Sequence, residues 1–301
     1  MSSLREIKDR IGSVRSTLKI TNAMKLVSSA KLRKAQQAIE ALRPYEATLS
    51  AILAEVSTRG VGIAGNPAAS RIAVVAVASN SSLCGSFNGN VLRKTLEVLR
   101  DGTPLGGSAS LADVFPIGRR IADPLRKAGF PAARDLNELA AHPGYEAASE
   151  LAQSLTDAYA AGVYSKVILI YNHFVTASRQ EVVCETYLPW NDSPTKRAEN
   201  VGDPGSEEGV AYENGDFCGR YIVEPSPSSV AETLLPQVMR LKIYAMLLDS
   251  AAAEHAARMI AMQTATDNAQ DILDELTLEY NKGRQQQITA EILDIVGGSQ
   301  Q

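Results

Sequence analysis

The stretch "LREIKDRIGSVRSTLKITNAMKLVSSAKLRKAQQA", Leu4 to Ala38, decides the fold, because its first apolar residues recur at alternating spacings of three and four. This spacing is the seam of a coiled-coil helix, which is narrower than the apolar face of a globular helix. After Leu18 the seam fades into polar residues, but the helix-forming composition extends to about Ser57. Pro44 removes one backbone donor and predicts a kink. We therefore expect a coiled-coil helix over residues 1–58, with the seam Leu4, Ile7, Ile11, Val14 and Leu18.

A second helix of this kind is predicted at the other end of the chain, over residues 230–296. Its seam continues from Leu241 to Tyr280 without Pro or Gly. Pro236 fits the first turn, where a missing backbone donor is harmless. Many seam positions are small or polar, which indicates a weak, smooth coil. They are Leu241, Ala245, Leu248, Ala252, His255, Met259, Met262, Thr266, Ala269, Leu273, Leu276 and Tyr280.

The two terminal helices carry opposite charge. From Arg10 to Lys34 the first has seven basic residues and no acidic one, whereas the second has five acidic residues and no basic one from Asp267 to Glu279. Complementary charge and matching seams favour pairing of the two helices with one another. Because they lie at opposite ends of the chain and a middle domain joins them, the pair can be antiparallel.

The middle of the chain, residues 71–224, reads as a separate α/β domain. Short apolar runs that indicate buried strands alternate with helical segments, a pattern typical of a mainly parallel, Rossmann-like sheet. The segment 191–219, rich in Gly, Asp, Glu and Pro, is predicted to be an exposed loop. The predicted strands are "RIAVVAVAS", "DVFPIG", "SKVILIYNHF" and "QEVVCETYLPW", and the helices are "NVLRKTLEVLR", "RRIADPLRKAG" and "HPGYEAASELAQSLTDAYAAG".

Composition limits the classes of function. The 301 residues carry a formal net charge of −4, which disfavours nucleic acid as a partner of the whole molecule. Cys84, Cys184 and Cys218 are far apart and form no CxxC pair, which argues against a disulfide framework and a cysteine zinc site. "MSSLREIKDRIG" has charges where a signal peptide needs an apolar core, so we do not expect it to be one, and no apolar run is long enough to span a bilayer. We therefore expect association with a membrane only through partner proteins.

No catalytic residue, cofactor or metal ion is predicted. The loop "AVASNSSLCGSFNGN" lacks GxGxxG and GxxxxGK[ST], so it reads as a structural turn rather than a phosphate site. Cys84 has no assigned histidine partner and is expected to be a small packed residue. His142, His173 and His255 are widely separated, which makes a metal site improbable.

The basic run of the first helix has three interpretations. It can be a solvated face, it can meet an acidic surface of a partner or of the second helix, or it can bind DNA as zipper proteins do. DNA binding is disfavoured because the better seam precedes the basic run instead of following it. A separate alternative is a nucleotide-binding α/β enzyme with helical oligomerisation arms, to which the missing phosphate motif is the main objection.

Four segments together resemble the gamma subunit of F-type ATP synthase. They are "KITNAMKLVSSAKLRKAQ", "SLCGSFN", "EPSP" and "AARMIAMQTATDNAQDILDELTLEYNKGRQQQITAEILDIVGG". The resemblance implies that the terminal helices form an antiparallel coiled coil inside a ring of alpha and beta subunits. It further implies that the middle domain contacts the c-ring of the membrane sector and the epsilon subunit. Ion flow would turn the c-ring and this shaft, and the shaft would bias the catalytic beta subunits for ATP synthesis or hydrolysis.

The resemblance also implies a location and a set of contact residues. The chain would be a non-catalytic, peripheral protein on the cytoplasmic side of a bacterial inner membrane. Met24 and Lys25 would lie near an acidic loop of the beta subunit, and Arg258 would take part in coupling. Polar contacts with the catalytic subunits would come from Arg284, Gln285, Thr289 and Glu291. An apolar bearing would be formed by Ile288, Ile292, Ile295 and Val296.

Two features depart from the family pattern. The chain ends in "GGSQQ", whereas the family often ends in Gly-Ala and a short apolar tail, so contacts at the tip are less well supported. The loop 191–219 carries Cys218 without a nearby second cysteine. The thiol switch of chloroplast relatives is therefore not expected.

Overall fold

The computed structural model describes residues 4–56, 71–100, 112–190, 223–224 and 226–298, so the predicted loop 191–219 lies outside the described residues. The chain divides into two compact units. Unit 1 comprises Met1–Ala30 with Arg258–Gln301, and unit 2 comprises Lys31–Ala257. The two long helices, α1 (Leu4–Val56) and α6 (Pro227–Gly298), each contribute to both units. The predicted domain boundaries follow the helices rather than these units and stay a prediction.

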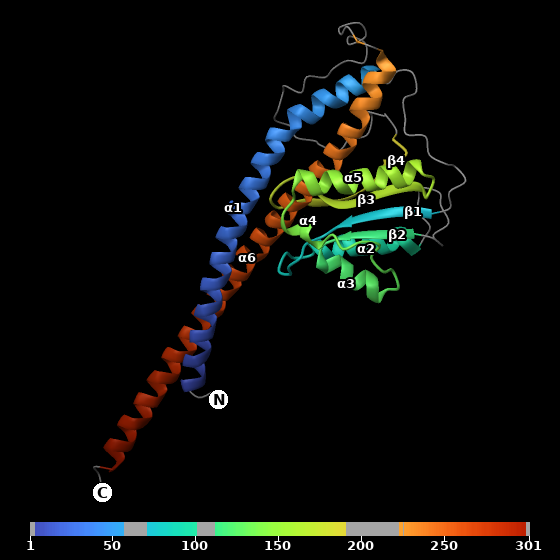
Figure 1. The fold of residues 1–301 in the computed structure, drawn as a ribbon. Coiled ribbons are helices and arrows are strands. Elements are labelled where there is room, and N and C mark those ends of the chain that lie inside the picture. The colour runs from blue at the N-terminus through green and yellow to red at the C-terminus, as the bar shows by residue number, and fades with distance from the viewer. Residues whose placement is uncertain (1–3, 57–70, 101–111, 191–222, 225, 299–301) are drawn as a thin grey trace. The chain divides into compact units, whose positions relative to one another are not determined.

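In unit 1, α1 and α6 form the predicted antiparallel pair (Figure 1). Thr266 on α6 donates its hydroxyl to Oγ1 of Thr21 on α1 at 2.9 Å. Farther toward the start of α1, a Cβ added at Gly283 would lie 2.9 Å from Cδ2 of Leu4. Going from Thr21 toward Leu4 on α1 thus corresponds to going from Thr266 toward Gly283 on α6, so the two helices run in opposite directions. The predicted seam residues of unit 1 are all buried or partly buried, which confirms the coiled-coil spacing.

Unit 2 contains a four-stranded sheet in the order β2-β1-β3-β4. The first three are parallel to one another, and β4 is antiparallel to β3, which confirms a mainly parallel sheet. β1 and β3 are nearly continuous apolar runs because helices cover both of their faces. The strands are β1 (Arg71–Val77), β2 (Ala112–Ile117), β3 (Tyr164–Phe174) and β4 (Gln180–Leu188).

Each face of this sheet packs against its own helices. Ile72, Val74 and Ala76 point into a core formed with α2 (Phe87–Arg100) and α3 (Arg119–Lys127). The alternate residues of β1 point into the opposite core, which includes α4 (Asn137–Ala141), α5 (Tyr145–Ala160) and the unit 2 parts of α1 and α6. Figure 1 shows α5 on one side of the sheet and α2 and α3 on the other. The long helices are therefore part of the core of unit 2.

The predicted position of Pro236 is wrong. α6 begins at Pro227, so Pro236 lies inside the helix rather than in its first turn. A proline in a helix interior costs about 3 kcal/mol because a hydrogen bond is lost. The neighbouring side chains of Leu235, Val238 and Met239 are buried in the core, and their burial outweighs this cost. α1 likewise continues through Pro44.

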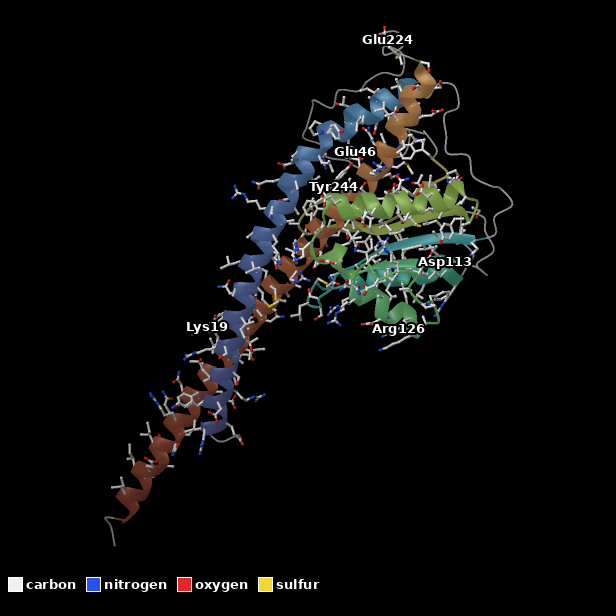
Figure 2. All side chains as sticks on the ribbon, in the orientation of Figure 1. Lys19, Glu46, Asp113, Arg126, Glu224 and Tyr244 are labelled. Atoms are coloured by element: carbon white, nitrogen blue, oxygen red, sulfur yellow. The ribbon has the colours of Figure 1, made fainter. Side chains whose placement is uncertain are left out.

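A polar cluster joins three strands where the parallel strands begin. Asp113 on β2, which Figure 2 labels, pairs with Arg71 on β1. It also accepts the hydroxyl hydrogen of Tyr164 on β3 at 2.9 Å. Burial of the ring, followed by the hydrogen bond to Asp113 and the charge of that carboxylate, raises the pKa of Tyr164 to about 12. The cluster therefore stabilises the phenol form of this tyrosine.

This pKa predicts a specific dependence of stability on pH. A group whose pKa is raised on folding contributes stability below its unfolded pKa, here about 10, and loses that contribution as the pH rises through the folded value. We expect the advantage of the unmodified chain over Tyr164→Phe, measured as free energy of unfolding in urea, to shrink between about pH 10 and 12. Parallel pH profiles of the two proteins would contradict this.

Candidate partner-binding surface

Lys25, a predicted contact residue, is tied into the helix pair of unit 1. Its Nζ donates to Oε1 of Gln263 on α6 at 2.8 Å, and its side chain is partly buried. Gln263 in turn donates through Nε2 to Oδ1 of Asp267 at 2.7 Å, about one turn further along α6. An amide thus links the lysine to a carboxylate on the partner helix. The sequence carries no signal for Gln263, because only the register of the pair brings it to Lys25.

Exposed apolar side chains flank Lys25 on α1. Ile20, Leu26 and Val27 are 60, 62 and 57% exposed, whereas Met24 is partly buried. These three residues lie between seam positions, so the seam does not account for them. In the sequence they can be found as apolar residues at positions of the helix that do not face the partner helix. They make the surface beside Lys25 both basic and apolar.

Arg258, another predicted contact residue, is only 8% exposed. A guanidinium is rarely buried to this extent in a folded protein. Its proposed contact with another subunit stays a prediction. Because the side chain is buried, its removal is expected to change stability as well as any contact.

Beyond Gly283, α6 continues as a single helix among the described residues. Arg284, Gln285, Thr289 and Glu291 are all exposed. Thr289 donates its hydroxyl to the backbone oxygen of Gln285 at 2.8 Å, and Gln287 donates to Oε1 of Glu291 at 3.4 Å. These bonds lie within the helix, so the polar side chains are presented to solvent.

Three of the predicted bearing residues form one apolar stripe on this segment. Ile288, Ile292 and Ile295 are 46, 55 and 72% exposed, and their spacing of four and three places them on one side of the helix. Val296 lies in α6, but its side chain is outside the described residues. Leu293, which the sequence analysis missed, adds a 64% exposed side chain. A stripe of this kind indicates a protein interface.

The loop after β1 is held by its own side chains. The backbone N–H and the hydroxyl of Ser79 both donate to Oδ1 of Asn88 at 3.0 Å, and Asn88 donates to Sγ of Cys84 at 3.1 Å. Cys84 is 1% exposed, which confirms its packing role. The described residues contain no group of three or more His, Cys, Asp or Glu side chains that could hold a metal ion.

No helix among the described residues combines the length and apolar character that crossing a membrane requires. Unit 1 exposes two groups of side chains. One side carries basic and apolar side chains beside Lys25, and the far end of α6 carries the isoleucine stripe.

The chain is similar to known proteins over its whole length. A family model described as ATP synthase matches residues 3–300. The ATP synthase gamma chain of Phocaeicola vulgatus is 44% identical over 303 residues, covering 99% of each chain. The ATP synthase gamma chain of Bacteroides thetaiotaomicron is 42% identical over 306 residues and covers 100% of both chains.

Solved structures with the same fold belong to mitochondrial ATP synthases. A chain of the Euglena gracilis OSCP/F1/c-ring assembly in rotational state 3 matches with a TM-score of 0.63 and 18% identity, covering 98% of this chain and 92% of that chain. A chain of the Tetrahymena thermophila central stalk and c-ring matches with a TM-score of 0.54 and 21% identity, covering 82% of this chain and 99% of that chain. At these identities the likeness concerns the fold.

Proposed function

The chain belongs to the gamma chains of ATP synthase, and from this premise we propose that it is the rotating central shaft of such an enzyme. In this role it couples ion-driven rotation of the membrane c-ring to conformational changes of the catalytic beta subunits, and it catalyses no reaction itself. The observation that carries the proposal is the helix pair of unit 1, from which α6 extends as a single helix with an exposed apolar stripe.

A shaft can bias a ring of subunits only if its sides differ. An effector shifts an equilibrium only through contacts that are stronger in one state than in another. In unit 1, α1 exposes Arg10, Arg15 and Lys19, whereas α6 exposes Asp271 and Glu275. Each orientation of the pair would therefore present a different charge to a given beta subunit.

The candidate residues divide into two kinds of contact. Lys25, with Met24 beside it, would attract an acidic loop of the beta subunit, and Arg284, Gln285, Thr289 and Glu291 would make polar contacts near the end of the shaft. The isoleucine stripe, extended by Val296, would turn in an apolar bearing. Apolar contacts suit a bearing because no directional hydrogen bond has to be broken at each step.

The other proposed partners lie outside the catalytic head. The α/β part of unit 2 would contact the c-ring and the epsilon subunit. The chain would then be held at the cytoplasmic side of a bacterial inner membrane through the complex rather than through a segment of its own. Nucleic acid is not a proposed partner.

Co-assembly tests the proposed function most directly. The chain is expressed with the alpha and beta subunits of its own organism, purified by a tag on the beta subunit, and assayed for ATP hydrolysis. We expect a stable complex that contains all three chains. A head that forms and hydrolyses ATP without retaining this chain would contradict the proposal.

Three substitutions separate a partner role of Lys25 from a role inside the coil. Lys25→Ala removes the charge and the bond to Gln263, whereas Gln263→Leu removes the bond and leaves the charge. We expect Lys25→Ala to lower coupled ATP synthesis by about fivefold and Gln263→Leu to lower it much less, because the partner recognises the charge. Gln270→Leu is the matched control, since Gln270 bonds Asp274 at 3.0 Å within α6 in the same way.

Equal losses in Lys25→Ala and Gln263→Leu would mean that Lys25 acts inside the coil. The same measurements on Gln270→Leu report the cost of losing a glutamine bond within α6. Free energies of unfolding of all three variants show whether any loss of synthesis follows from instability.

A further inference from the structure

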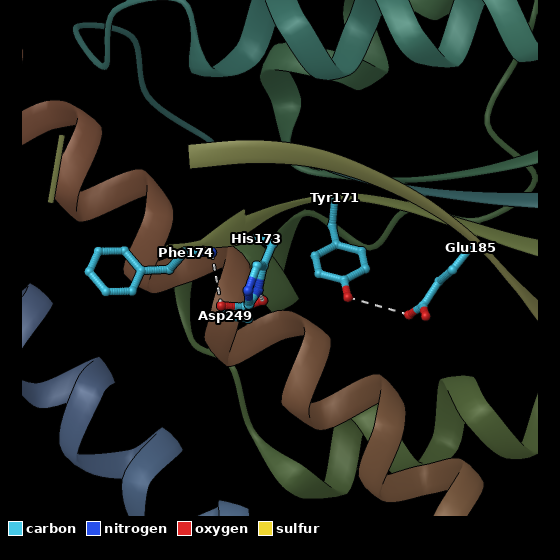
Figure 3. Close-up of polar contacts among 5 residues, drawn as sticks. All are labelled: Tyr171, His173, Phe174, Glu185 and Asp249. Atoms are coloured by element: carbon cyan, nitrogen blue, oxygen red, sulfur yellow. Dashed lines mark hydrogen bonds and ion pairs between the residues drawn. The ribbon is translucent and has the colours of Figure 1, made fainter. Parts of the chain in front are cut away.

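The end of strand β3 is attached to α6 through one carboxylate. Oδ1 of Asp249 accepts the backbone N–H of Phe174 at 3.1 Å, and Oδ2 lies 2.5 Å from Nδ1 of His173 (Figure 3). Both side chains of the His173–Asp249 pair are largely buried, at 27 and 14% exposed. An ionised carboxylate can only accept, so Nδ1 of His173 is the donor whether the imidazole is neutral or charged.

The same face of α6 also receives an apolar contact from β3. Phe174 packs against a small apolar cluster that includes Ala253 of α6, and Ala257 packs against the same cluster. Ala253 and Ala257 follow Asp249 at intervals of four residues. Residues four apart lie on one face of a helix. Two consecutive residues of β3 therefore hold one face of α6, His173 through a polar bond and Phe174 through both its backbone and its ring.

A second polar contact lies earlier along α6. Nζ of Lys242 is 3.3 Å from Oε2 of Glu185 on β4. Tyr171 on β3 donates its hydroxyl to Oε1 of the same carboxylate at 3.3 Å (Figure 3). Residues of both contacts line a cavity of about 60 Å³, and α1 contributes Arg43 and Glu46 to its lining. The β3–β4 hairpin thus makes polar contacts with α6 at two positions along the helix, Lys242 and Asp249.

Directional contacts matter here because apolar contacts do not fix an angle. Between Ala231 and Leu247, α6 packs in the large apolar core of unit 2. The hydrophobic effect is non-directional, so a helix held by it alone can roll against its neighbours. A hydrogen bond weakens steeply when its angle changes. Two bonds from one carboxylate to adjacent residues of a strand therefore resist rolling.

Asp249 follows the core-packed part of α6 and precedes Arg258, where unit 1 begins. We infer that Asp249 is a positioning residue that fixes α6 against rotation about its own axis relative to the sheet, so that torque passes between the α/β part of unit 2 and the shaft. His173 is its partner in this role. The inference rests on the proposed function, because only a rotating chain has to transmit torque.

The test uses the whole ATP synthase in lipid vesicles, with Asp249→Ala, Asp249→Asn, His173→Leu or His173→Lys in this chain. ATP hydrolysis and ATP-driven ion uptake are measured on the same vesicles. We expect Asp249→Ala to lower ion uptake per ATP by about threefold or more at nearly unchanged hydrolysis, because the head still turns α6 while α6 rolls against the sheet. Asp249→Asn keeps an acceptor for Phe174 and should lose less.

The histidine variants separate torque transmission from folding. His173→Lys keeps a donor for Asp249 and should retain most of the uptake ratio, whereas His173→Leu should lower it. A residue that only stabilises the fold would lower hydrolysis and uptake together through loss of enzyme, and the ratio would stay constant. Asp123→Ala is the control, because Asp123 is exposed and its ion pair among the described residues is a local one, with Arg126 at 3.1 Å on α3.

An unchanged ratio in both Asp249→Ala and His173→Leu would overturn the inference. If Asp249→Ala does not fold, as shown by its thermal unfolding, Asp249→Asn and His173→Leu decide the question. Failure of the proposed function has a different signature, since the unmodified chain would then be missing from the purified complex.

Discussion

Gly118→Ala should cost unit 2 about 3–5 kcal/mol of its free energy of unfolding. Gly118 has a φ of +106°, a backbone angle that residues with a side chain rarely adopt. A Cβ at this position would lie 2.3 Å from the backbone oxygen of Ala78. The obstacle is backbone that is itself fixed, since the N–H of Ala78 donates to the oxygen of Ile117 at 2.8 Å. Neither the backbone of Ala78 nor that of Gly118 can move away without breaking this hydrogen bond, which joins the ends of β1 and β2.

Gly129→Ala is the matched control for this prediction. Gly129 also has a positive φ, at +92, but a Cβ there would meet nothing within 4 Å. It should therefore show the cost of backbone strain alone, about 1–2 kcal/mol. Urea unfolding of the two variants measures the difference, and equal losses would show that the close approach of Ala78 is unimportant.

The second large effect is expected at the end of the shaft. Changing Ile288, Ile292 and Ile295 together to serine should weaken binding to the catalytic head about a hundredfold, at about 1 kcal/mol for each apolar side chain that the bearing buries. The free energy of unfolding of the isolated chain should hardly change, because all three side chains are exposed in it. The measurement is the dissociation constant for the alpha and beta head.

The triple leucine variant tests whether apolar character is what the bearing needs. Leucine keeps the apolar area of isoleucine but changes its shape, so binding should stay within a fewfold of the unmodified chain. Serine and leucine variants that bind equally well would remove the support for an apolar bearing at this stripe.

The helices and strands could be predicted because their signals are local and repeated. The three-four spacing continues through many turns of α6, and the apolar runs of β1 and β3 are long enough to exclude a loop. The antiparallel pairing of β4 with β3 could also have been predicted from the sequence, since only residues 175–179 separate the two strands. Parallel neighbours need a crossover of a dozen or more residues.

Other features depend on contacts that the sequence does not specify. Pro236 was wrongly expected in the first turn of α6 because the usual preference of proline for a first turn was outweighed by packing on both sides of it. α4 is too short to show a period. The contact of Lys25 with a partner subunit stays a prediction, and its bond to Gln263 follows from the register of two helices that lie more than 200 residues apart in the chain.

The single helix beyond Gly283 has a consequence for the energetics of assembly. An isolated helix of roughly 15 residues is only marginally stable in water, because it gains nothing from tertiary packing. In the free chain, the backbone amides of residues 284–298 should therefore exchange their hydrogens with solvent far faster than those of β1 or β3. Part of the binding free energy of the head is then consumed in keeping this segment helical, so protection of these amides from exchange would record assembly residue by residue.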